Sequence, residues 1–169
     1  MNSIVVKWNL IDFLLERITT VSFYKKKDRI AELRFLNKNS FKLSIKERCE
    51  YKINCVDNNL GLEFEILNLQ NQNKWLLLNE NREFSFGKID IPILDTGEIE
   101  IRVKSKGRSN TYYFEKEIIG KTDSTFLNIF KLVIKEVDIL NEEYFDALLV
   151  GCSIEIIQEY HCKLFQGVD

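Results

Sequence analysis

The sequence predicts an α+β protein that is mainly β: an antiparallel β-sandwich, immunoglobulin-like or of a related Greek-key type, followed by a C-terminal α-helical hairpin. Between residues 20 and 119, apolar residues recur mainly at every second position, which is the period of half-buried strands. Between residues 124 and 165 they recur at every third or fourth position, which is typical of amphipathic helices. We therefore expect an N-terminal segment over 1–19, a β-sandwich body over 20–120 and a helical hairpin over 121–169.

The N-terminal segment combines the patterns of a short strand and a brief helix. Residues 3–8 (SIVVKW) are mostly apolar, as a short strand requires. Asn9 can cap a following helix, because its side chain accepts hydrogen bonds from the free N–H groups of a first helical turn. Ile11, Leu14 and Ile18 then recur at helical spacing.

The body has the pattern of short strands separated by turns. Phe41, Leu43 and Ile45, for example, alternate with polar residues. Clusters of Asn, Asp, Gly and Gln separate these runs, as at residues 57–61 and 68–73, and Asn, Asp and Gly favour turns. Short strands at regular spacing, without helices between them, are typical of an antiparallel sandwich. We expect strands at residues 20–25, 31–35 (which also fits a helical turn), 41–46, 51–55, 62–66, 74–78, 83–86, 88–94, 99–104 and 111–119.

Two helices are expected in the C-terminal segment. Ser124, or the aspartate before it, can cap a first helix over residues 126–137. Asn141 can cap a second helix over residues 142–160, and Gly151 within it indicates close packing against a neighbour. An isolated pair of helices cannot bury both apolar stripes, so the hairpin must dock on the body, on another subunit or on a partner.

Composition is that of an ordinary globular protein. With 45% apolar and 30% charged residues, the 169-residue chain can bury a core and is not expected to be disordered. Charged residues interrupt the apolar N-terminal segment, and no apolar stretch has the length of a membrane span, so we expect neither a secretory signal nor membrane contact. We therefore expect a cytoplasmic protein whose four cysteines are reduced thiols.

Charge divides the chain into two unequal parts. Residues 1–122 hold 21 Lys and Arg against 17 Asp and Glu, whereas residues 123–169 hold 3 against 9. Such opposed charges steer a charged partner or attract the two parts to each other. We take the basic stretch and the start of the second helix as candidate partner-binding surfaces. Their residues are Lys25, Lys26, Lys27 and Arg29 on the basic side, and Glu142, Glu143 and Asp146 on the acidic side.

The tripeptide Asp95-Thr96-Gly97, together with the later Ile-Ile-Gly at 118–120, resembles the loop signature of retropepsin-like aspartic proteases. The resemblance implies that Asp95 shares a proton with its twin in a second copy and activates water. The two tripeptides lie much closer together than in that family, and no glycine-rich flap separates them. Asp and Gly between two alternating runs also predict a hairpin turn, and we adopt this interpretation.

No cysteine–histidine site is predicted. His161, the single histidine, stands beside Cys162 and nine residues after Cys152. Neighbouring residues on a helix point about 100° apart, and nine residues span more than two turns, so the imidazole is badly placed to activate either thiol. The spacing matches no standard zinc site. We therefore predict no catalytic residue, no metal ion and no cofactor.

These observations favour a non-enzymatic intracellular protein that binds another protein, as an adaptor, an assembly subunit or a small inhibitor of the immunity type. Association of the chain with copies of itself is a further alternative. One alternative is nucleic-acid binding through the basic stretch and Arg108, because basic residues beside aromatic ones suit phosphate contact and base stacking. The net charge of −2 argues against it. Another alternative is carbohydrate binding, with Trp8, Trp75 or Tyr112 as stacking platforms.

Overall fold

One antiparallel sheet and one helix make up the part of the chain that the computed structural model describes, which is residues 2–8, 19–58, 61–84, 87–106, 109–124, 130–134 and 142–166. Within these residues the strands are β1 (Asn2–Lys7), β2 (Thr20–Lys25), β3 (Asp28–Asn37), β4 (Ser40–Ile45), β5 (Cys49–Asn58), β6 (Gly61–Asn68), β7 (Lys74–Phe84), β8 (Gly87–Asp95), β9 (Glu100–Lys106), β10 (Ser109–Phe114), β11 (Glu117–Ser124) and β12 (Phe130–Ile134), and the helix is α2 (Glu142–Gln166).

The sheet closes into a ring. Each strand pairs antiparallel with its neighbours in sequence, and β1 also pairs with β12, where Ile4 lies opposite Leu132. On its other side β1 pairs with β2, where Val6 lies opposite Phe23. The expected sandwich of two sheets is therefore not confirmed, although the antiparallel, mainly β character is. Alternating apolar and polar residues indicate only that each strand buries one of its faces. A single closed sheet buries one face of every strand, as two packed sheets do, so the pattern fits both architectures.

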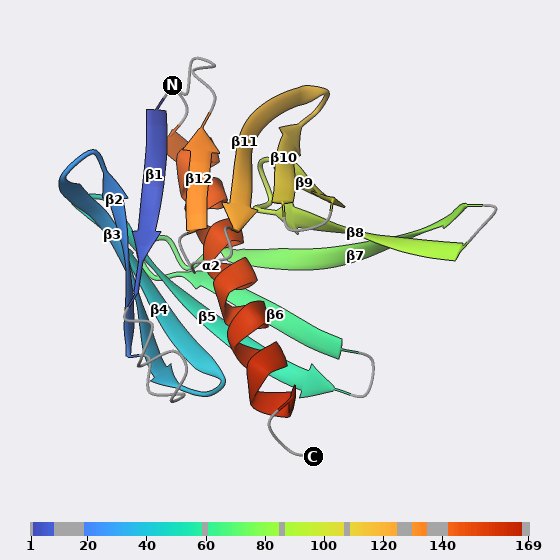
Figure 1. The fold of residues 1–169 in the computed structure, drawn as a ribbon, viewed down its shortest axis with the longest axis horizontal. Coiled ribbons are helices and arrows are strands. Elements are labelled where there is room, and N and C mark those ends of the chain that lie inside the picture. Colours follow the sequence, from blue (N-terminus) through green and yellow to red (C-terminus); the bar gives the residue numbers. More distant parts are fainter. Residues whose placement is uncertain are drawn as a thin grey trace.

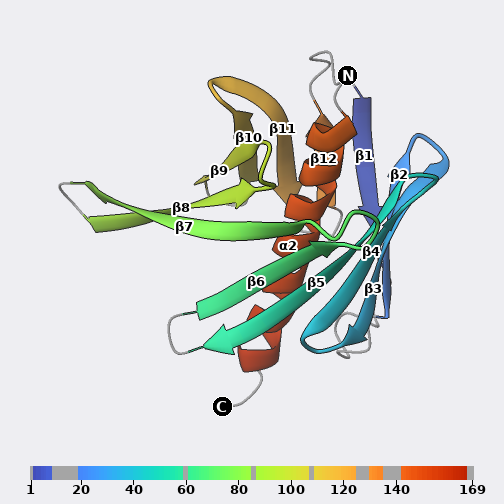
Figure 2. The ribbon, with the colours of Figure 1, turned by 180° about the vertical axis from the view of Figure 1, so that it is seen from behind.

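The helix α2 lies between the walls of this ring, and views from opposite sides show strands both behind it and in front of it (Figures 1 and 2). Residues 147–150 are completely buried. Since successive helical residues point about 100° apart, four buried residues in a row mean that α2 is covered on every side here. The chain therefore fills the interior of the ring with its own helix. Within the described residues no helix is long and apolar enough to cross a membrane.

The helical hairpin is not confirmed, because the described residues contain only its second helix. Residues 117–124 and 130–134 form the strands β11 and β12 where we expected the first helix to begin and run. Thr122 of β11 lies opposite Leu132 of β12. The run Phe130–Ile134 is short and apolar, and such a run fits a buried strand as well as a helix. Its pairing with strands on both sides accounts for the strand conformation.

The other expected strands are confirmed, with two changes. The run 74–78 and the described part of the run 83–86, residues 83 and 84, belong to one strand, β7. The run 111–119 is divided between β10 and β11 by a turn at Glu115, whose φ is 52°. The expected N-terminal strand is β1. The expected helix over residues 9–18 lies outside the described residues.

Two glycines bring α2 and the sheet into close contact. A Cβ atom at Gly151 would lie 2.6 Å from Cε1 of Tyr112, on β10. A Cβ atom at Gly120, on β11, would lie 2.8 Å from Cδ2 of Leu148. Both distances are well below van der Waals contact, so a larger residue would force its neighbour to move. The close packing expected at Gly151 is confirmed.

We expect Gly151→Ala to lower the free energy of unfolding by about 2 kcal/mol, although alanine favours a helix by about 1 kcal/mol over glycine. The reason is that the ring of Tyr112 is only 1% exposed and cannot swing into solvent. Denaturant unfolding measures the change. In the double variant Gly151→Ala/Tyr112→Leu the smaller leucine side chain makes room for the added methyl group. The free energy of unfolding should therefore fall by less than the sum of the decreases in the two single variants. Strictly additive losses would contradict this account of the contact.

Candidate functional site

A recess opens at the N-terminal end of α2, with a volume of about 470 Å³. Its walls come from four regions: the turn between β4 and β5 with the start of β5, the connection from β6 to β7, the loop between β8 and β9, and the first turns of α2. The residues that line it are Glu47, Arg48, Cys49, Tyr51, Asn68, Gln70, Asn71, Asn73, Trp75, Thr96, Glu98, Glu142, Glu143 and Asp146.

Asp146 is a buried carboxylate in the wall of this recess, and its side chain is held by the sheet. Its Oδ2 accepts hydrogen bonds from Sγ of Cys49 at 2.9 Å and from the hydroxyl of Tyr51 at 3.0 Å. Both donors occupy inward positions of β5, two residues apart. Trp75 supports Tyr51 from behind, with ring centres 4.7 Å apart. The carboxylate of Asp146 is thus held by hydrogen bonds to β5, next to the packed rings of Tyr51 and Trp75.

Arg48 is the one cation among the described residues that line the recess, and α2 holds its guanidinium. Nη2 of Arg48 donates to the carbonyl oxygen of Glu142 at 2.7 Å and lies 3.0 Å from Oδ1 of Asp146. The guanidinium also lies over the ring of Phe145, 5.5 Å from its centre. Through these contacts Arg48 balances the charge of Asp146 and connects the turn between β4 and β5 to α2.

The Cys49 thiol acts in this recess as a hydrogen-bond donor and not as a nucleophile. Burial raises the pKa of Cys49 to about 12, and its hydrogen bond to Asp146 acts in the same direction. A nucleophilic cysteine instead has its pKa lowered toward neutrality, because the thiolate is the reactive form. Burial likewise raises the pKa of the Tyr51 hydroxyl. Both groups therefore stay protonated near neutral pH, and each donates a hydrogen bond to the carboxylate.

The recess carries an excess of negative charge. The side chain of Glu142 is 82% exposed, so its carboxylate meets solvent at the rim. Glu143 accepts a hydrogen bond from the hydroxyl of Thr96 at 2.7 Å, which fixes it beside the loop between β8 and β9. Acidic residues in the first turn also suit the positive end of the helix dipole. The recess therefore attracts cationic groups. Its five carboxylates belong to Glu47, Glu98, Glu142, Glu143 and Asp146.

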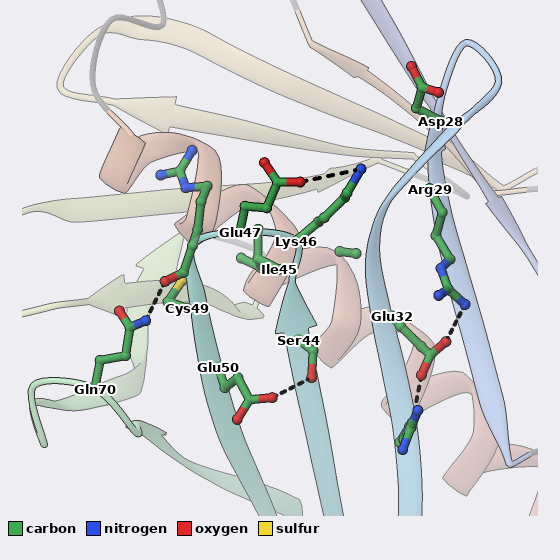
Figure 3. A pocket seen from close by; sticks show the side chains of 13 residues that line it. Asp28, Arg29, Glu32, Ser44, Ile45, Lys46, Glu47, Cys49, Glu50 and Gln70 are labelled. Carbon is green, nitrogen blue, oxygen red and sulfur yellow. Dashed lines mark hydrogen bonds and ion pairs between the residues drawn. The ribbon is translucent and has the colours of Figure 1, made fainter.

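A second hollow adjoins the recess across the turn between β4 and β5, and Figure 3 shows the side chains around it. Its volume is about 820 Å³, and Arg48 is among the residues that line both hollows. Glu32 binds two arginines there, Arg29 at 2.7 Å and Arg34 at 2.6 Å. Four acidic and four basic residues line this hollow, so their charges balance. It offers no net attraction for a charged partner.

The predicted basic surface lies at the turn between β2 and β3. Lys25 ends β2, and Lys26 takes a left-handed conformation in the turn, with φ of 58°. Lys26 and Lys27 are exposed, whereas Arg29 is paired with a glutamate. Arg108, the remaining residue of the nucleic-acid alternative, lies outside the described residues. Nucleic-acid binding through this turn stays a prediction.

The structure brings the predicted acidic residues together at the recess but does not present them alike. Glu142 is exposed and Glu143 is half-buried, whereas Asp146 is only 7% exposed. Sequence reasoning did not connect Asp146 with Cys49 and Tyr51. Two signals were available: a carboxylate inside an apolar helical stripe needs a buried partner, and the two β5 residues lie at alternate positions that face the same side.

A second carboxylate of α2, Glu155, meets donors in the wall of the ring. The hydroxyl of Tyr112 donates to its Oε1, and the hydroxyl of Thr122 donates to its Oε2 at 2.9 Å. Burial raises the pKa of Glu155 to about 7; the hydrogen bonds from Tyr112, Asn110 and Thr122 act against this rise, and the charge of Glu159 adds to it. Its surroundings therefore favour the protonated acid at mildly acidic pH.

Of the residues named for carbohydrate binding, Trp75 and Tyr112 are buried and Trp8 is half-buried. Of those named for cysteine–histidine chemistry, Cys152 and His161 are buried, and the side chain of Cys162 lies outside the described part of the structure. Trp75 is 3% exposed and Tyr112 is 1% exposed, so neither offers an open face for a sugar ring. His161 is buried, with its ring 6.3 Å from that of Phe41. Burial raises the pKa of the Cys152 thiol. Among the described residues no three His, Cys, Asp or Glu side chains group as metal ligands.

The tripeptide at residues 95–97 forms a turn between β8 and β9. The backbone N–H of Gly97 donates to Oδ1 of Asp95 at 2.8 Å, and Gly97 has a φ of 88°, which glycine adopts without strain. Thr96 is buried and its backbone N–H donates to the carbonyl of Ile99 at 3.1 Å. The expected hairpin turn is confirmed.

No protein-family model matches this sequence, and neither a curated protein nor a solved structure is detectably similar to it.

We expect the stability of the protein to fall as the pH rises from about 4.5 to about 7, and the effect of Glu155 to level off above that. The unfolded chain releases this proton near pH 4.5, whereas the folded protein holds it to a pKa of about 7, so ionisation between these values favours unfolding. The shift corresponds to a loss of about 3 kcal/mol. Denaturant unfolding between pH 4.5 and pH 8 measures it.

The matched variants for this test are Glu155→Gln and Glu63→Gln. Glutamine at 155 keeps a neutral acceptor and does not titrate, so this variant should lose less stability across the window than the unmodified protein does. Glu63 is exposed, and its variant should follow the unmodified protein. Parallel curves for all three proteins would contradict the assignment.

Proposed function

We propose that this protein is a non-enzymatic, cytoplasmic protein-binding module that binds a basic segment of its partner in the recess at the N-terminal end of α2. The observation that carries the proposal is the charge of this recess. Five carboxylates line it, and Arg48, the one cation among its described lining residues, is already bound to α2. A lysine or arginine of a partner therefore meets an attractive potential there.

The filled interior of the ring supports binding at its surface. Small barrels that carry a ligand hold it inside. Here α2 occupies that space, and its residues Leu148, Cys152 and Ile156 are each at most 1% exposed. An incoming molecule therefore meets the ends and the outer face of the ring, and the recess is a concave site at one end of the helix.

Asp146 is already paired with a cation, Arg48, in the wall of the recess. Its Oδ2 already has two donors, whereas Oδ1 accepts no hydrogen bond of good geometry from the described residues, although Nη2 of Arg48 lies 3.0 Å away. Asp146 as a whole is 7% exposed. An incoming ammonium or guanidinium group therefore meets first the exposed side chains of Glu98 and Glu142, whose carboxylates are strong acceptors for a charged donor.

Amide side chains beside the carboxylates suit the backbone of an extended segment. Asn71 and Asn73 line the recess and are exposed. Each amide side chain carries both a donor and an acceptor, so it can pair with a peptide group of either orientation. The recess therefore combines charge for basic side chains with neutral polar groups for the main chain that carries them.

We expect the double variant Glu98→Gln/Glu142→Gln to bind the partner about tenfold more weakly, because it removes two of the charges that attract a basic segment. The partner is first isolated by affinity capture from lysate of the source cell, in nuclease-treated and untreated halves. Binding of the purified partner is then measured by biolayer interferometry at low and high salt. The loss should be larger at low salt, where these charges are less screened.

The matched control is Glu63→Gln/Glu100→Gln, which makes the same change in net charge at exposed positions outside the recess. Carbodiimide coupling of the complex should also join recess carboxylates to lysines of one partner segment. An equal loss in both double variants would show that net charge alone attracts the partner, and would contradict the proposal. Capture that disappears on nuclease treatment would contradict it too, in favour of nucleic-acid contact near Lys26.

A further inference from the structure

The hairpin of β7 and β8 extends beyond the ring as a two-stranded ribbon. β6 pairs with β7 only along Lys74, Trp75 and Leu76. β9 pairs with β8 only from Ile93 to Asp95. Within the described residues, 77–84 and 87–92 pair with each other and with no third strand. Figures 1 and 2 both show this ribbon projecting from the body.

A projecting ribbon has two free edges, each with a row of unpaired N–H and C=O groups. An isolated two-stranded hairpin is marginally stable in water, and a free edge is a template for another strand. The two edges differ in this chain. β8 contains Pro92, which has no N–H to donate and therefore weakens that edge as a template. The outer edge of β7, from Leu77 to Phe84, contains no proline.

The outer edge of β7 is complementary to itself. If two copies pair antiparallel about Asn81, residue 80 of one copy lies opposite residue 82 of the other. The position of Glu80 is then directly across from that of Arg82 on both sides of the two-fold axis, and the position of Leu78 is across from that of Phe84. Opposite charges and apolar pairs directly across two strands stabilise a sheet, whereas a shift of one residue would remove both matches.

The register within the ribbon supports the same pairing. Glu80 lies opposite Ile91 and Arg82 lies opposite Ile89, so these four positions share one face of the ribbon. Residues directly across a new antiparallel pair also share a face. The isoleucine positions of both copies would therefore lie on the same side of the enlarged sheet.

We propose that a second copy of this chain is the occupant of this edge: β7 of each copy pairs with β7 of the other, antiparallel and symmetric about Asn81. The product is a four-stranded sheet in the order β8, β7, β7, β8, with the first pair from one copy and the second from the other. Such an interface is isologous and closes after two subunits. The pairing uses β7 from Leu77 to Phe84, and none of these residues is among those that line the recess at the N-terminal end of α2.

The test is a charge exchange read out by sedimentation velocity of the full chain at concentrations up to 100 μM. The unmodified protein should dimerise. Glu80→Arg places arginine opposite Arg82 in both halves of the interface, and Arg82→Glu places glutamate opposite Glu80. Each single variant should therefore dimerise about tenfold more weakly, because like charges face each other twice. Asp90→Arg, on β8, is the control and should leave the dimer unchanged.

Mixing the two single variants distinguishes this register from any other effect of the substitutions. In a mixed dimer every arginine at position 80 or 82 faces a glutamate, so the mixture should recover dimers that neither variant forms alone. The double variant Glu80→Arg/Arg82→Glu should also recover them. An unmodified protein that stays monomeric at 100 μM would overturn the proposal and leave the edge for a strand of another protein. A mixture without recovery would overturn it as well.

Discussion

A ring of strands must fill its own interior, and in this protein a single helix of the same chain does so. Residues of β3, β4, β5, β10 and β11 meet α2, from Phe35 against Tyr160 to Gly120 against Leu148. Residues 147–154 are all buried, so the helix has no side exposed to solvent there. Both the fold and the recess depend on how this helix is positioned, because the mouth of the recess is the place where α2 enters the ring.

Two carboxylates fix that position in different ways. Asp146, near the N-terminal end of α2, meets two donors from β5 and the cation Arg48. Glu155, more than two turns later, meets neutral donors of β10 and β11. If the helix rotated or slid, each carboxylate would lose its hydrogen-bond donors while it stayed buried. The free energy of its desolvation would then not be offset, so each contact resists such a movement. The contact of Asp146 is with a cation, whereas burial raises the pKa of Glu155 and holds it closer to its neutral form.

The sequence predicted individual strands well because alternation is a local property. Runs such as Phe41–Ile45 show it directly, and β2, β4 and β8 lie where it placed them. It did not distinguish a sandwich from a ring, since that difference lies in the pairing of β1 with β12, about 130 residues apart. It also mistook residues 130–134 for part of a helix, because five apolar-rich residues fit either period.

The recess was found only in part for a similar reason. Glu142, Glu143 and Asp146 form one local acidic group that a sequence reveals, and they do line it. Their partners Arg48 and Tyr51 stand almost 100 residues earlier, and nothing in the spacing of the chain joins the two segments. A charge within an apolar stripe, such as Asp146, needs a buried partner, but the sequence does not show which residue that partner is.

The order of the elements along the chain has a consequence for synthesis. All twelve described strands precede α2, so a ribosome releases the wall of the ring before the helix that fills it. Until α2 emerges, the inward faces of Leu33, Leu43 and Ile53 have no partner and remain open to water or to chaperones. Long-range pairing of this kind also slows folding, because distant ends must meet before their contacts stabilise anything. The growing chain therefore completes its interior last, as a single late event and not strand by strand.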